Sequence, residues 1–153
     1  MPMIEITGQS GVLSAEERVE LPKRLAAILL RWEGAPDTAK FRALSWGYLR
    51  ELPADAVSAA SGDGLPRWRI DVTVPEGALS PRRTEGLVDE VTRAVLEAAG
   101  LGAEDAHRVW VLVHTQPDGS WGAGGKVVRS IDLSDLAAAE RAELAASASA
   151  AHR

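Results

Sequence analysis

The residue of this sequence with the most distinctive chemistry is Pro2, which directly follows the initiator methionine. A proline at the amino terminus of a chain carries a basic secondary amine, and its ring nearly fixes the φ angle. Pro2 gains that amine when Met1 is removed. If packing of the following strand buries the nitrogen, its charged form is disfavoured and its pKa falls, as a general base near neutral pH requires. Because this motif is so short, Pro2 alone leaves open the alternative that it has no role.

The other residue types give no second catalytic motif. The three histidines, His107, His114 and His152, have no metal-ligand spacing with one another or with carboxylates. The chain has no cysteine, which excludes thiol chemistry, disulfides and thiolate metal sites. The glycine-rich stretch 116–126 lacks the glycine and hydroxyl positions of a phosphate-binding Walker loop. We therefore expect no metal and no cofactor.

Length and charge bound the class of protein. A chain of 153 residues fits one domain with a real core. Its 17 basic and 22 acidic residues give a net charge of −5, which does not favour a nucleic-acid or acidic-membrane partner. No apolar stretch reaches the length of a membrane span, and the first residues do not resemble a signal peptide. We expect a cytoplasmic protein with a small-molecule or protein partner.

The elements that would position Pro2 form a strand-helix-strand unit. Residues 2–6 alternate in character as a strand with two faces does. Ser14, with a glutamate three residues later, has the form of a capping box, and an apolar stripe predicts a helix that ends at Gly34. Pro22 lies inside this helix, which predicts either a kink or a later start. Residues 41–52 then predict a second strand.

The same pattern restarts after a connector. Residues 66–72 repeat the pattern of the first strand, Ser80 and Pro81 open the clearest helix of the sequence, and residues 109–115 form a strand pattern. An internal repeat of about 65 residues indicates a pseudo-twofold arrangement. We predict an α+β fold with a four-stranded sheet and two helices. We expect a single domain, 1–153, with two β-α-β units at 2–52 and 66–128. The connector 53–65 joins the two units, and a helical tail follows at 133–150.

Two features follow the second unit. The glycine-rich stretch favours a hairpin or bulge with positive φ angles. Its Trp121 either packs on the core or lines a pocket, and the residues leave this open. The alanine-rich tail 133–150, with Ser134 as its cap, predicts a short helix on the surface of this chain or of a neighbour.

Four stretches together resemble the tautomerase superfamily, which includes the 4-oxalocrotonate tautomerase-like proteins. They are Met1-Pro2-Met3-Ile4-Glu5-Ile6, Leu79-Ser80, Val109-Trp110-Val111-Leu112-Val113-His114 and Gly119-Ser120-Trp121-Gly122-Ala123-Gly124-Gly125-Lys126. The resemblance covers residues 2–128. It implies β-α-β units fused in pairs, a trimer, and an amino-terminal proline that serves as a general base or acid. The doubled length is most similar to the members that include cis-3-chloroacrylic acid dehalogenase and malonate semialdehyde decarboxylase.

The resemblance also suggests substrate-binding residues. Arg42, on the predicted second strand, matches a substrate-binding arginine of the family, and Trp121 matches an active-site aromatic residue. The family's arginine before the helix-opening serine is replaced by leucine in both halves. Arg82 and Arg83, in the first turn of the second helix, are the candidates to replace it, although such side chains are often only solvated. Asp37 is the one nearby candidate for an acid or base, and it lies out of register with the decarboxylase's aspartate.

Three functions follow from these residues. The first choice is a small-molecule tautomerase (an isomerase) in which Pro2 removes a proton next to the carbonyl of an enolisable keto acid. The alternatives are a cofactor-free dehalogenase, hydratase or decarboxylase of a three-carbon acid, and a non-catalytic trimeric binding protein. We expect a homotrimer in each case, because sheet edges and apolar faces such as that of Trp68, Ile70 and Val72 would need cover.

Overall fold

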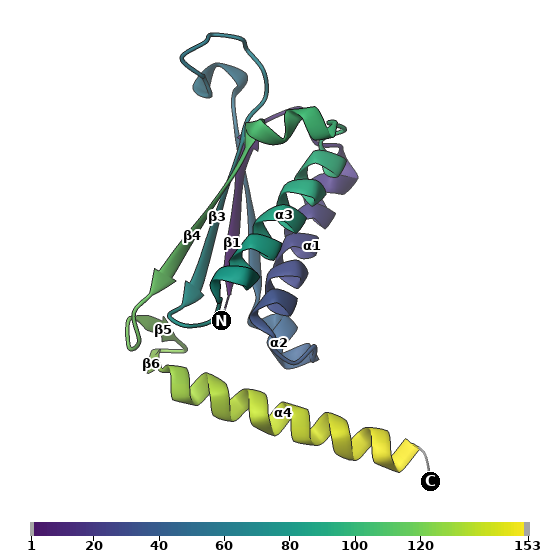
Figure 1. Ribbon diagram of the computed structural model, residues 1–153, viewed down its shortest axis with the longest axis vertical. Coiled ribbons are helices and arrows are strands. Elements are labelled where there is room, and N and C mark those ends of the chain that lie inside the picture. The colour runs from purple at the N-terminus through teal and green to yellow at the C-terminus, as the bar shows by residue number, and fades with distance from the viewer. Residues whose placement is uncertain (1, 152–153) are drawn as a thin grey trace.

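The computed structural model of the chain describes residues 2–151 (Figure 1). A four-stranded sheet is formed by β1 (Met3–Gln9), β2 (Trp46–Leu52), β3 (Trp68–Pro75) and β4 (Val109–Gln116). The helices are α1 (Ala15–Glu33), α2 (Ala39–Ala43), α3 (Pro81–Ala98) and α4 (Ser130–Ala151). A small hairpin of β5 (Trp121–Ala123) and β6 (Lys126–Val128) precedes α4, and 3-10 turns span Ala54–Ala56 and Ala103–Arg108.

The sheet has the strand order β2-β1-β3-β4. β1 and β2 run parallel, as do β3 and β4, and each pair is joined through a helix. β1 and β3 run antiparallel at the centre, where Glu5 lies opposite Asp71. Two β-α-β units therefore meet around a pseudo-twofold axis, and the start of β1 and the start of β3 lie at opposite ends of the sheet. The predicted four-stranded α+β architecture is confirmed.

Helices α1 and α3 cover one face of the sheet (Figure 1). A serine just before each helix caps it by accepting a hydrogen bond from a backbone N–H of the first turn. Ser14 accepts from Glu17, and Ser80 accepts from Arg83. Gly34 ends α1 in the left-handed conformation, with a φ angle of 72°. Pro22 lies within one helix that begins at Ala15, so the predicted later start is wrong.

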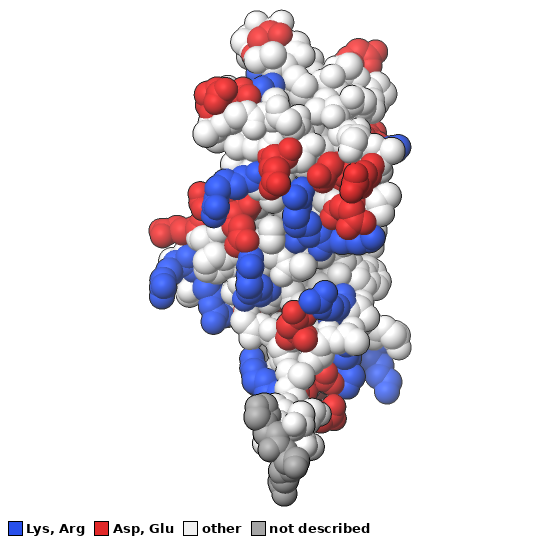
Figure 2. All heavy atoms as spheres, turned by 90° about the vertical axis from the view of Figure 1, so that its right-hand side faces the viewer, with Lys and Arg blue, Asp and Glu red and all other residues white. Residues whose placement is uncertain are grey.

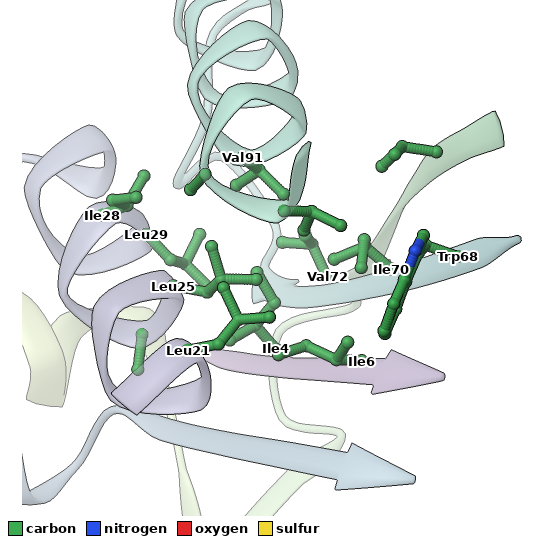
Figure 3. Close-up of a cluster of buried hydrophobic side chains, with 14 of the residues drawn as sticks. Ile4, Ile6, Leu21, Leu25, Ile28, Leu29, Trp68, Ile70, Val72 and Val91 are labelled. Carbon is green, nitrogen blue, oxygen red and sulfur yellow. The ribbon is translucent and has the colours of Figure 1, made fainter. Parts of the chain in front are cut away.

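The core lies between this helix layer and the sheet (Figure 3). Ile4 and Ile6 of β1 are fully buried against leucines of α1, and Ile70 and Val72 of β3 lie beside them. Trp68 closes the core at the start of β3 and is 2% exposed. The helices of the same chain thus cover the face of Trp68, Ile70 and Val72, so the expectation that this face needs a partner is wrong. The uncovered face of the sheet is the opposite one.

The predicted strand 41–52 is wrong in its first part. Residues 39–43 form the short helix α2, and the strand begins only at Trp46. Thr38 caps α2 by accepting a hydrogen bond from the backbone N–H of Phe41 at 3.3 Å. The Phe41 side chain is 5% exposed. A local cap and a buried aromatic side chain therefore stabilise a helical turn that outweighs the alternation seen in the sequence.

The end of the chain forms the predicted hairpin and a longer helix. Gly124 and Gly125 both have positive φ angles in the two-residue turn between β5 and β6, as this tight turn requires. The tail helix α4 begins at Ser130, three residues before the predicted start and ahead of the predicted cap Ser134. Asp118 accepts a hydrogen bond from the Ser130 backbone at 2.7 Å, which fixes this earlier start.

The helix face of the molecule is a mixture of both charges (Figure 2). Arg24 pairs with Glu17 at 3.0 Å, and Arg31 of α1 pairs with Glu90 of α3. Such exposed pairs contribute little stability, but they keep this face polar. Among residues 2–151, no helix is long and apolar enough to cross a membrane.

Candidate active site

Pro2 is buried at the point where β1 begins. Its carbonyl oxygen accepts a hydrogen bond from the backbone N–H of Trp46 at 3.1 Å, which ties it to the first residue of β2. Ile4 and Ile6, the next residues that face the helices, are fully buried and anchor the strand that follows. The core therefore holds Pro2 in a fixed place. Met1, on whose removal the amine of Pro2 depends, lies outside the described residues.

A pocket of about 360 Å³ opens at this end of the sheet. In the β1–β3 register, Met3 lies opposite Thr73, so the chain before Met3 runs toward Pro75, which lines the pocket. The other walls are the end of α1, the turn after β3, the start of α3 and the first part of α4. Pro2 and this pocket thus belong to the same end of the sheet.

Two arginines of the pocket wall hold the end of α1. Arg83 of α3 donates from Nη1 to the carbonyl oxygen of Glu33 at 3.1 Å. Arg141 of α4 donates from Nη2 to the carbonyl oxygen of Gly34 at 2.8 Å. These carbonyls carry the negative end of the helix dipole, so the contacts are charge-assisted. The pocket wall therefore contains two guanidinium groups whose positions are fixed by the backbone.

Glu33 lines the same pocket, and its carboxyl group is an unusually weak acid. Its side chain is half-buried. Burial raises the pKa of Glu33 from 4.5 to about 7. The other carboxyl groups with a resolved shift in residues 2–151, such as those of Asp37 and Asp71, have lowered pKa values. Glu33 can therefore give or take a proton near neutral pH.

The helix α4 closes the outer side of this pocket. Glu140 is 6% exposed and pairs with Lys40 of α2 at 2.6 Å. The hydrogen bond from Lys40 holds the pKa of the Glu140 carboxyl below its usual range. The ion pair between Glu140 and Lys40 holds this turn of α4 in place. Because Arg141 is the next residue, the same ion pair also positions its side chain.

Asp37 and Arg42 do not line this pocket. They form an ion pair with each other, with Nε–Oδ1 and Nη2–Oδ2 distances of 2.5 and 2.8 Å, and both are about two-thirds exposed. The hydrogen bond from Arg42 lowers the pKa of Asp37. Arg42 is on α2 rather than on a strand, and it lines grooves of about 440 and 550 Å³ beside α1. In this chain, the predicted acid or base and the predicted carboxylate-binding arginine therefore neutralise each other.

The structure separates the other candidates. Arg82 and Arg83 both line a hollow of about 370 Å³ beside Trp32, but only Arg83 also lines the pocket at the end of Pro2. Trp121 is half-buried in β5, opposite Val128, and does not line that pocket. Of the predicted residues, the fold brings Pro2 and Arg83 to the same end of the sheet, where Arg83 lines the pocket and Pro2 does not.

Sequence reasoning missed Glu33 and Arg141. A signal for Glu33 was present, because an acidic residue in the last turn of a helix opposes the helix dipole and calls for an explanation. No local signal marks Arg141, since it depends on how α4 docks against the end of α1. That docking rests on contacts across about a hundred residues of chain.

Comparison with known proteins supports the same fold. Residues 69–131 match the family model "Tautomerase enzyme". A search of curated proteins finds no match. Among solved structures, the chain is similar to Pt0534 inactivated by 2-oxo-3-pentynoate, with 23% identity over 82% of this chain and 94% of that one and a TM-score of 0.69.

Two further structures extend the likeness. N1, described as a member of the cis-3-chloroacrylic acid dehalogenase family, has 20% identity over 87% of this chain and 99% of its own, with a TM-score of 0.68. The Q0 fused 4-OT, a symmetric trimer, has 18% identity over 85% and 97% of the two chains, with a TM-score of 0.70. The family model thus matches the second β-α-β unit, and the chain as a whole, with its two β-α-β units, shares the fold of these structures.

Proposed function

We propose that this protein is a small-molecule tautomerase that uses the nitrogen of Pro2 as a general base on an enolisable keto acid. The observation that carries the proposal is the position of Pro2. It is buried at the start of β1, at the same end of the sheet as a pocket that contains Arg83, Arg141 and Glu33. A base that removes the proton, a cation that stabilises the enolate and an acid that returns a proton all favour enolisation of a keto acid.

Each group has a role in the proposed reaction. The lone pair of Pro2 takes the proton next to the substrate carbonyl, which creates an enolate. A guanidinium has five N–H donors, so Arg83 and Arg141 can bind a substrate carboxylate or the enolate oxygen besides their carbonyl contacts. Glu33, half protonated near pH 7, provides or accepts the second proton. The amine exists only after removal of Met1, because an amide nitrogen has no basic lone pair.

A second candidate is hydrolytic chemistry on a small acid, as in a hydratase, dehalogenase or decarboxylase. Its support is Glu33, whose carboxylate form is a base strong enough to activate water near neutral pH. In that reaction Pro2 would be protonated and act as an acid. The structural neighbour N1 belongs to a dehalogenase family by its description, which agrees with this candidate.

We also propose that the protein is a homotrimer. The sheet face away from the helices exposes Trp46 and Tyr48, which are 58% and 43% exposed. Large aromatic side chains on one face are typical of an interface between protein chains. The Q0 fused 4-OT with the same fold is a trimer.

Covalent labelling with 2-oxo-3-pentynoate, the compound that inactivated Pt0534, tests the role of Pro2. The amine of Pro2 adds to the electron-poor alkyne: an N–C bond forms, one π bond breaks, and the proton of the amine ends on carbon. The expected result is one adduct with the whole mass of the reagent on the amino-terminal peptide. Labelling that is absent, or that is spread over lysine side chains, would contradict the proposal.

The two adjacent arginines provide a matched pair for this experiment. Arg83→Gln is expected to slow labelling about tenfold or more, because a charge-assisted hydrogen bond to the reagent's carboxylate is lost. Arg82→Gln changes the same charge one residue away, outside the pocket, and is expected to leave the rate near that of the unchanged protein. Equal effects of both changes would mean that overall charge, rather than a contact in the pocket, controls the reaction.

A further inference from the structure

A larger cavity lies at the opposite end of the sheet, away from Pro2. Its volume is about 620 Å³, within the usual range for small-molecule sites. β3 starts here, at Trp68, and reaches the other end at Pro75 (Figure 1). Eight extended residues separate the two cavities by about 20 Å or more. The connector after β2, including Ala56, Val57 and Ala59, forms its roof.

Two residues that line this cavity each carry a buried donor that finds no hydrogen-bond partner within residues 2–151. The donors are Nε1 of Trp68 and Nε of Arg108, whose residues are 2% and 6% exposed. A buried polar group left unpaired costs free energy, so a native structure usually satisfies it with protein, water or a ligand. Two such groups in one cavity indicate a missing acceptor.

Both donors are held where they are. The indole ring of Trp68 lies over Gly8 so closely that a Cβ there would come within 2.1 Å of the ring. Nη2 of Arg108 pairs with Asp105 at 2.6 Å, and its Nη1 donates to the carbonyl oxygen of Pro66 at 3.3 Å. These contacts use the ends of the guanidinium and leave Nε free. The two donors therefore form a preorganised part of the wall.

The positive charge of the cavity wall favours an anionic ligand. Within the described part of the chain, the lining contains Arg67, Arg69, Arg108 and His107 and no carboxylate, in a protein whose net charge is −5. An aspartate outside the lining pairs with each arginine, at 2.6 Å for Arg67, 2.9 Å for Arg69 and 2.6 Å for Arg108. These pairs fix the guanidiniums but leave the cavity itself lined by donors. An oxygen acceptor is the group that such a wall binds.

The remaining lining is apolar. Leu52, Val57 and alanines of the connector lie on one side, and the Trp110 ring, 70% exposed, lies at the rim. We propose that this cavity is a second ligand site, for a small carboxylate with an apolar or aromatic body. The carboxylate accepts hydrogen bonds from Trp68 Nε1 and Arg108 Nε, and the body packs under the connector against Trp110. This site is independent of Pro2 and of any reaction there.

Calorimetric titration of the full chain with 3-phenylpropanoate tests the site. The expected result is saturable binding at millimolar concentration or below, and binding about tenfold weaker or more for the neutral 3-phenylpropanamide, which lacks the charge. Trp68→Phe keeps an aromatic ring, although a smaller one, and deletes the N–H, and it is expected to weaken binding about tenfold. The exposed Trp46, at the other end of the sheet, supplies the matched control Trp46→Phe, which should bind as the unchanged protein does.

Because Trp68→Phe changes a buried side chain and can disturb the fold, a second variant tests the site without changing Trp68. Ala59→Trp fills the cavity from the half-buried connector and is expected to abolish binding while leaving the melting temperature nearly unchanged. Labelling of Pro2 by 2-oxo-3-pentynoate serves as a separate readout that neither variant should alter. Absence of binding would overturn the proposal. So would binding that survives Ala59→Trp and disappears in Arg83→Gln, because the ligand would then occupy the pocket near Pro2.

Discussion

At the scale of single residues, the raised pKa of Glu33 leads to a testable pH dependence of turnover. Its carboxyl has a pKa of about 7 in a pocket that also holds two guanidinium groups. If its protonated form supplies a proton to the enolate, turnover falls as pH rises above 7, while the need for unprotonated Pro2 makes turnover rise at lower pH. The account therefore predicts a bell-shaped profile whose alkaline side belongs to Glu33.

Substitution of this carboxyl tests the assignment. Glu33→Gln is expected to lower kcat about a hundredfold, the lower end of the usual contribution of a general acid or base, and to remove the alkaline side of the profile. Asp37→Asn, which changes a carboxyl already paired with Arg42, is expected to leave the profile in place. The measurement is kcat against pH for a 2-keto acid. An alkaline limb that persists in Glu33→Gln would assign it to another group.

The same shift links Glu33 to stability. Its pKa is higher in the folded protein than the ordinary value of 4.5, so the folded state binds more protons between those values. The free energy of unfolding therefore falls as pH rises from 4.5 to 7, by at most about 3 kcal/mol. Urea unfolding at pH 4.5 and 7.5 measures this difference. Glu33→Gln should make it smaller, and an equal pH dependence in both proteins would show that other groups cause it.

At the scale of elements, the close approach of the two long helices depends on Gly86. A Cβ at this position of α3 would lie 2.2 Å from the Trp32 ring of α1, whose Nε1 donates to Glu90 at 2.8 Å. Gly86→Ala is therefore expected to destabilise the protein by about 1–3 kcal/mol, as overpacking does. Gly122→Ala places the same methyl group in ordinary contact and should have little effect. Chemical unfolding of both variants compares them, and equal stabilities would contradict this packing.

The elements also explain how far the sequence could predict the structure. The caps Ser14 and Ser80 and the buried stripe of α3 were predictable, because the signals are local and agree with one another. The strand 41–52 was mispredicted because the burial of Phe41 and the cap of Thr38 outweigh alternation. Arg141 could not be predicted, since its place in the pocket depends on the docking of α4, for which the sequence has no local signal.

At the scale of the whole molecule, the uncovered face of the sheet governs assembly. Tyr48 lies on that face beside β1, where Glu5 is its register partner. Tyr48→Glu would place a second carboxylate against Glu5 and remove an aromatic contact, so it is expected to dissociate the proposed trimer. Val19, which is 56% exposed against 43% for Tyr48 and lies on the helix side, supplies the control Val19→Glu. Sedimentation at micromolar concentration should show a trimer for the control and a monomer for Tyr48→Glu. A stable monomer of the unchanged protein would remove this architecture.

The proposed catalysis depends on the free amine of Pro2, and the most direct test of that amine compares two forms of the same chain. One form begins at Pro2, and the other carries one extra residue before it. The fold should survive in both, because the backbone bonds of β1 do not use that nitrogen. The measurement is the rate of enolisation of a 2-keto acid, with the intact mass of each form determined first. The account predicts turnover by the form that begins at Pro2 and its loss in the extended form, whereas equal rates would contradict it.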